Sequence, residues 1–317
     1  MSSSGRTTRR QGQASAAGSA PCLFHVTFWG VRGSIPSPGP RTGVYGGNTS
    51  CVEVRCGERL LVFDLGSGAR ALGERLGARA APASADLFLS HYHYDHLQGL
   101  PFFSPMFDAR NHFVIRGPTR AQRDVQSILA GQMSPPYFPV TAEAVFLARV
   151  EYRPIAAGDV VQLGEVQVRA LELNHPGGAL GYRVDFQGLS VVYATDIEHG
   201  SSADGHLADF ARDTDVLIYD AMYTPEEYVG PPGKLGWGHS TWTAAVEAAR
   251  AAHAKRLVLF HHDPERDDAS LRAVERKARR LYPGTLAARE GLTLKLEQEA
   301  RRSSVRGTHL GAARGAG

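Results

Sequence analysis

The stretch HYHYDH, residues 91–96, decides how the rest of this 317-residue chain is interpreted. It follows residues 85–90 (ADLFLS), an apolar run typical of a buried strand. Three histidines and an aspartate thus share one loop, and imidazole with carboxylate suits zinc, manganese or iron. The alternative is a polar loop whose histidines face water or cap backbone groups. Packing such groups together without a cation would cost free energy, so the spacing favours a metal site.

The H-x-H-x-D-H spacing resembles the signature of the metallo-β-lactamase superfamily. The resemblance implies that His91 and His93 bind one metal ion, whereas Asp95 and His96 bind a second. In that superfamily the other ligands follow later strands, so the rest of the chain should supply them in order.

Three later strand-like runs are each followed by a residue of ligand type: His175, Asp196 and His261. Each of these residues alone could simply cap a strand end. Taken in order, the resemblance assigns His175 to the first ion, His261 to the second, and Asp196 to a position that bridges both. His262 is the alternative to His261, because adjacent residues of a strand point to opposite sides.

Strand-like runs with helices between them occur in the same order twice along the chain. This order predicts an α/β (α+β) protein of the αββα type, in which two mixed β-sheets face each other and helices lie outside. The site would lie along one edge, where the strands end. Asp64 ends another such run, and either caps the following helix or lies near the metal ions, as an aspartate does in the resembled family.

Charge is unevenly distributed along the chain. Residues 1–20 hold three arginines and no acid, and residues 301–317 hold four arginines and no acid, although the whole chain has a net charge of only +3. We expect two disordered basic tails around one hydrolase domain at residues 21–300. That domain is net acidic, which predicts that no long structured RNA is a partner.

Other features of the composition bear on location. No run of eighteen apolar residues occurs, so no membrane partner is expected. The first residues lack the apolar segment of a secretory signal, and three scattered cysteines make no disulfide framework. These features predict a cytoplasmic protein.

Within the superfamily, the sequence is more similar to ribonuclease Z and the cyclic-nucleotide phosphodiesterases. The bridging position holds Asp196 rather than the cysteine of many lactamases. The segment Gly238-His239-Ser240-Thr241 resembles the one that carries the catalytic histidine of ribonuclease Z, which implies a catalytic role for His239. The alternative is that His239 merely precedes Ser240, the expected N-cap of the next helix. The acid partner would be Asp220, in place of a glutamate in the family.

The resemblance implies a hydrolase that uses two divalent ions, with zinc expected and manganese or iron as alternatives, and with Asp95, His239 and Asp220 as catalytic residues. Ribonuclease Z grips tRNA with a long arm, and too few residues lie between His175 and Asp196 to form one. We therefore expect a small phosphodiester substrate, such as a cyclic nucleotide, and a homodimer is compatible with the family. The alternatives are a thioester or lactone hydrolase of the glyoxalase II type, and a metal-bound sensor without catalysis.

Overall fold

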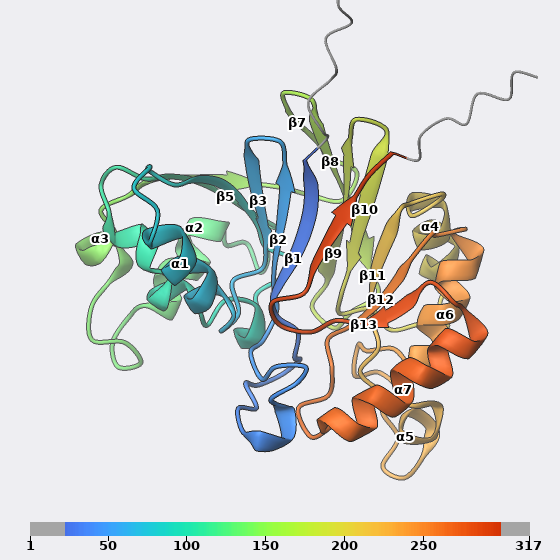
Figure 1. Cartoon of the computed structure of the whole chain (residues 1–317). Helices are drawn as coiled ribbons and strands as arrows, with labels where there is room; N and C mark the ends of the chain where they lie inside the picture. Colours follow the sequence, from blue (N-terminus) through green and yellow to red (C-terminus); the bar gives the residue numbers. More distant parts are fainter. Residues whose placement is uncertain (1–22, 299–317) are drawn as a thin grey trace, which may run out of the picture.

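A computed structural model describes residues 23–298, and two seven-stranded β-sheets form the centre of this part of the chain (Figure 1). The first sheet has the order β14-β1-β2-β3-β4-β5-β6, and the second has the order β13-β12-β11-β10-β9-β8-β7. The first comprises β1 (Phe24–Gly30), β2 (Cys51–Cys56), β3 (Arg59–Phe63), β4 (Ser84–Phe88), β5 (His112–Gly117), β6 (Arg149–Pro154) and β14 (Thr293–Leu296). The second comprises β7 (Val160–Leu163), β8 (Val166–Leu173), β9 (Ala179–Phe186), β10 (Leu189–Ala194), β11 (Val216–Asp220), β12 (Leu257–Phe260) and β13 (Thr285–Ala287).

Helices cover the outer face of each sheet (Figure 1). The helices of the described residues are α1 (Ala69–Gly77), α2 (Val125–Gln132), α3 (Ala142–Val145), α4 (Ala203–Phe210), α5 (Pro225–Val229), α6 (Trp242–Ala251) and α7 (Asp268–Leu281). Of these, α5 lies at the lower end of the molecule in Figure 1 rather than on a sheet face. Short 3₁₀ turns are η1 (Pro40–Thr42), η2 (Tyr94–His96), η3 (Leu100–Phe102) and η4 (Ser104–Phe107). Both sheets mix parallel and antiparallel neighbours, so the predicted αββα sandwich of two mixed sheets is confirmed.

Alternating apolar residues produce this layering. In β8 the even positions from Val166 to Ala170 are buried and the odd ones are half-buried, so one face of the strand points into the space between the sheets. Aromatic residues such as Phe63 and Tyr182 fill that space. In α7, Val274 and Ala278 recur at helical spacing and bury one stripe against the second sheet's outer side, whereas Leu271 packs with Tyr45 and Ala287.

Strand direction explains why the candidate ligands gather at one edge. Strands β3, β4 and β5 are parallel to one another, and so are β10, β11 and β12. Strand β8 runs in the same direction as β10, since each is antiparallel to β9. The ends of β4, β8, β10 and β12 are therefore the points where the chain reaches the candidate ligands, and open α/β sheets bind ligands at such ends.

Two further predictions concern the ends of the chain and membranes. The predicted basic tails, residues 1–20 and 301–317, lie outside the described residues. Among residues 23–298, the helices are too short or too polar to cross a bilayer. The cytoplasmic location stays a prediction.

Candidate metal centre

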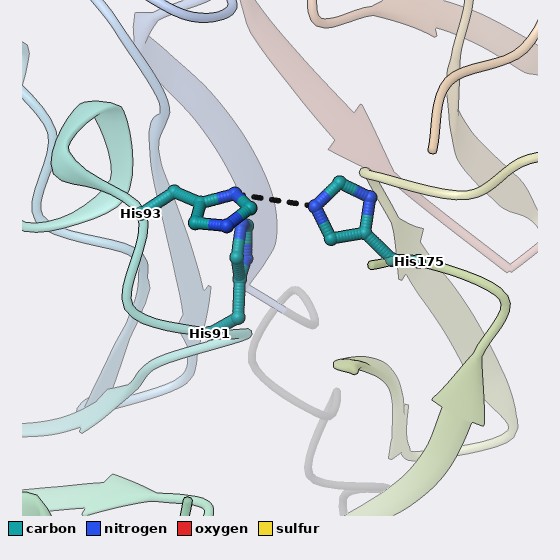
Figure 2. A group of neighbouring side chains, drawn as sticks. All are labelled: His91, His93 and His175. Carbon is teal, nitrogen blue, oxygen red and sulfur yellow. Dashed lines mark hydrogen bonds between the residues drawn. The ribbon is translucent and has the colours of Figure 1, made fainter. Parts of the chain in front are cut away.

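Three imidazoles form a first cluster. His91 and His93 lie in the loop after β4, and His175 lies in the loop after β8. Figure 2 shows His93 and His175 reaching toward each other above His91, and Nε2 of His175 lies 3.2 Å from Nδ1 of His93. One ligand atom from each of the three residues lies within 4.8 Å of the others, which is close enough to share one ion.

A second cluster combines Asp95, His96, Asp196 and His261, and all four side chains are buried. Nε2 of His96 lies 3.2 Å from an oxygen of each carboxylate, and Nε2 of His261 lies 3.2 Å from Asp95 Oδ2. His262 turns the other way and contacts the Ala288 carbonyl oxygen at 2.9 Å. The structure therefore places His261, and not His262, in the cluster.

Asp196 lies between the two clusters. Its Oδ1 is 3.7 Å from His91 Nε2 and 3.9 Å from His175 Nε2, whereas its Oδ2 is 3.2 Å from His96 Nε2. Asp196 and His261 have left-handed backbones, with φ of 56° and 57°. Such φ values are uncommon outside glycine and cluster at functional sites, where they aim a side chain that a regular strand would direct elsewhere.

The hydrogen-bond pattern of the histidines fits bound cations. The Ser90 hydroxyl donates to Asp64, so His91 Nδ1 must donate to Ser90, and its buried Nε2 is left without a proton or a partner. His175 Nδ1 likewise donates to the Gly238 carbonyl oxygen, which leaves its Nε2 without a proton and 3.2 Å from His93 Nδ1. Burial lowers the pKa of His91 and of His175, which keeps both rings in the neutral form that binds metals.

The second cluster fits a cation for a related reason. Burial opposes a charged ring at His96, but the surrounding carboxylates, Asp196 first, raise its pKa well above the usual value. A proton on this ring thus takes the place that a metal ion would take between the nitrogen and the carboxylates. Asp95 keeps its charge, because the neighbouring His96 and His261 lower its pKa despite burial. Nitrogen and oxygen donors of this kind suit zinc, manganese and iron.

Asp64 supports the second cluster from behind. Its Oδ2 accepts hydrogen bonds from His96 Nδ1 at 2.8 Å and from the Tyr193 hydroxyl at 2.7 Å, and its Oδ1 accepts from the Ser90 amide. No side chain caps α1. Of the two interpretations of Asp64, proximity to the candidate ligands is the one that the structure supports, and a carboxylate in this place orients a metal-binding histidine.

His239 and Asp220 form a hydrogen-bonded pair beside both clusters. His239 Nδ1 lies 2.8 Å from Asp220 Oδ2, and Asp220 is fully buried. Burial disfavours a charged ring, but Asp220 outweighs it and raises the pKa of His239 to about 9. The shorter acid side chain therefore reaches the histidine. The N-cap of α6 is Thr241 rather than Ser240, because the Ser240 hydroxyl donates to the Ile197 carbonyl oxygen instead.

A pocket of about 350 Å³ opens above the centre. It is lined by Ser34, Tyr92, His93, Tyr94, Asp95, Asp196 and His239. Three residues of this set, Ser34, Tyr92 and Tyr94, were not predicted from the sequence as parts of the site. His239 and a residue from each cluster thus face the same space, which is the arrangement that a hydrolytic reaction needs.

The loop after β1 belongs to the site, although no residue of this loop was predicted to do so. Arg32 is fully buried and donates to the carbonyl oxygens of Gly46, Asp263 and Arg266. This anchor places the Ser34 amide 2.8 Å from Asp95 Oδ2. The one available signal was an arginine flanked closely by glycines, which is too common to indicate a site.

The family of the chain follows from a model of the "Beta-lactamase superfamily domain", which matches residues 61–262. The chain belongs to this superfamily. Its relatives and its ligand clusters indicate a metal-dependent hydrolase. A ribonuclease Z from Natronomonas pharaonis is 26% identical over an alignment of 288 positions, which covers 75% of this chain and 86% of the relative.

Two solved structures show the same fold. The short form of human tRNase Z superimposes with a TM-score of 0.62 at 20% identity, covering 86% of this chain and 98% of the human chain. Zinc-bound PqqB from Methylobacterium extorquens has a TM-score of 0.64 at 17% identity, covering 86% of this chain and all of PqqB.

The prediction that excluded long structured RNA and left only a small-molecule partner is wrong. Relatives named ribonuclease Z match most of the chain, and tRNase Z shares its fold. The prediction failed because net charge does not distinguish the surface from the interior. Four carboxylates counted as acidic surface are buried around the candidate centre: Asp64, Asp95, Asp196 and Asp220. The lack of an arm after His175 excludes one way of binding RNA, but it does not exclude RNA as a partner.

Proposed function

We propose that this protein is a phosphodiesterase that acts at a centre of two divalent ions. The observation that carries the proposal is the His239–Asp220 pair, which lies at the pocket above both ligand clusters. Attack on a carbonyl carbon needs no such pair beyond the ions and water. Cleavage of a phosphodiester releases a poor leaving group, and a positioned proton donor is valuable there.

The first cluster would hold one ion and the second cluster the other, with Asp196 shared between them. We infer zinc, in keeping with the imidazole and carboxylate donors and with the zinc-bound relative. When bound, two such ions polarise the phosphate and activate a water molecule for attack.

The remaining chemistry belongs to side chains of this protein. Asp220 accepts from His239 Nδ1, so the proton on Nε2 is the one that can reach the departing oxygen. Two backbone amides, of Met222 and Ser240, hold the other oxygen of Asp220 and fix the direction of the ring. The Ser34 amide fixes Asp95 in the same way. A pocket of this size accepts one nucleotide, whether a cyclic nucleotide or one end of a longer chain.

A substrate panel on protein of known metal content tests the proposal. It should include bis(p-nitrophenyl) phosphate, cyclic nucleotides, a 3′-extended tRNA, S-lactoylglutathione and a homoserine lactone, each with and without chelator. We expect hydrolysis of one or more phosphodiesters, and its loss with chelator. Turnover of the thioester or lactone alone would contradict the proposal, and metals without any turnover would favour a sensor.

His239→Ala tests the role of the pair. We expect bound metal to stay the same while turnover of a phosphodiester with a poor leaving group falls by about 10²–10⁴, the usual contribution of a general acid. Bis(p-nitrophenyl) phosphate, whose leaving group needs little protonation, should lose less. Equal activity of the variant and the parent protein on the poor leaving group would mean that His239 is only a neighbour of the helix cap.

A further inference from the structure

The segment between α5 and α6 carries a cation, Lys234, near the candidate centre. The Lys234 ammonium lies 4.0 Å from the centre of the Trp237 ring and 5.7 Å from that of Tyr223. The Tyr223 ring in turn lies 6.1 Å from the His239 ring. Within residues 23–298, no carboxylate pairs with Lys234. These side chains thus form a row from the surface to His239, and the positive charge of Lys234 is available to a ligand.

This segment is fixed firmly to the candidate metal ligands. Glu198 is buried, and its carboxylate accepts from the Gly236 amide at 2.6 Å and the Gly238 amide at 2.9 Å. The Gly238 carbonyl oxygen accepts from His175 Nδ1 at 2.8 Å. At Gly238, where φ is +84°, an added Cβ would lie 2.3 Å from the His175 ring. Lys234 and Trp237 are therefore held at a set place relative to His175 and His239.

Trp237 has the exposure of a binding residue rather than a core residue. Its relative exposure is 54%, although tryptophan usually buries most of its ring. An exposed ring that lies near a fixed ammonium can stack on a nucleobase while the ammonium binds a phosphate, and both contacts are common in nucleotide recognition.

We propose that Lys234 and Trp237 form a subsite for the leaving group of the substrate, with Lys234 binding a second phosphate and Trp237 stacking on a nucleobase. The inference rests on the proposed function, in which His239 protonates the departing oxygen and so defines the leaving-group side. The substrate class is then a phosphodiester whose leaving group is a nucleotide with a phosphate of its own. A leaving group without that phosphate would not use Lys234.

Equilibrium binding to the zinc-loaded protein tests the subsite without relying on turnover. The probes are adenosine 3′,5′-bisphosphate, adenosine 5′-monophosphate and ribose 5-phosphate, measured by calorimetry. We expect the bisphosphate to bind about tenfold more tightly than the monophosphate, as one well-placed charge contact provides. In Lys234→Met this ratio should fall to about one. In Trp237→Ala the preference for the monophosphate over ribose 5-phosphate should fall by a similar factor.

Lys277→Met, which removes an exposed lysine of α7, is the matched control and should keep every ratio. A parent protein that binds mono- and bisphosphate equally, or a Lys234→Met variant that keeps the preference, overturns the subsite. Circular dichroism of each variant shows whether a lost ratio reflects a lost fold. Failure of the proposed function is distinguishable, because it would appear as no hydrolysis of any phosphodiester in the panel, whatever these ratios are.

Discussion

The two clusters of the candidate metal centre differ in charge and in exposure. The first cluster consists of three imidazoles, of which His93 is exposed. The second cluster contains Asp95 and Asp196 and is buried throughout. With Asp196 shared, an ion in the second cluster would face two carboxylates in a site shielded from water, whereas an ion in the first would face one carboxylate and three neutral rings, so the second ion gains more. The second cluster should therefore hold its ion more tightly, and the first should exchange its ion with solvent more readily.

The partners behind the ligands differ in the same direction. In the first cluster, His91 donates to the neutral Ser90 hydroxyl and His175 donates to a backbone carbonyl oxygen. In the second, His96 donates to the Asp64 carboxylate. A carboxylate behind a histidine makes the ring a stronger ligand than a neutral acceptor does. The two candidate ion sites can thus differ in affinity through residues that would touch neither ion.

Asp196→Ala should produce the largest effect, because this side chain faces both clusters. Removing it takes the shared carboxylate from both ions, and we expect the loss of at least one of the two metal ions together with most turnover. Elemental analysis of the purified variant measures the bound metal, and the phosphodiester assay measures the turnover. Asp209→Ala removes an aspartate of α4 that is 71% exposed and should change neither. Two full equivalents of metal in Asp196→Ala would remove the basis for a shared ligand.

Asp64→Asn should have a smaller effect that falls mainly on the second cluster, because Asp64 contacts His96 directly and reaches His91 only through Ser90. The amide keeps the size of the side chain but replaces the charge behind His96 with a neutral group. Loss of such a partner typically weakens metal binding by about 10–100-fold. A competition titration with a zinc indicator should show one ion weakened clearly more than the other. Equal weakening of both ions would show that the clusters do not differ in the way proposed.

The part of the site that could be predicted from sequence consists of residues next to buried strands. His91 and Asp196 directly follow apolar runs, so their position at the sheet edge followed from the strands themselves. The fold was predictable for the same reason, since alternation along strands such as β8 fixes which face is buried. Chemically distinctive residues in a regular setting made both inferences possible.

The rest of the site depends on contacts between remote segments. Arg32 is held by carbonyl groups of Asp263 and Arg266, more than 200 residues away, and no local pattern indicates such a contact. Glu198 supports the segment before His239 through backbone amides, which sequence does not distinguish from any others. Ser240 and Thr241 are both good cap residues, and only the packing against Ile197 decided between them.

The smallest perturbation is a graded removal of metal from the unaltered protein. If the first cluster binds its ion less tightly, a chelator titration should remove the ions in two steps. We expect the chelator concentrations of the two steps to differ by about tenfold, which is the lower end of the usual effect of a residue that supports a metal ligand. His93→Ala should abolish the first step and leave the second in place, because the second cluster does not contain His93. His112→Ala, on β5 and paired with Glu151, is the matched control and should keep both steps. A single step in the parent protein, or loss of the tighter step in His93→Ala, would show that carboxylates and burial do not make the two clusters differ in metal affinity. Asp196 would then make the two ions bind as one unit.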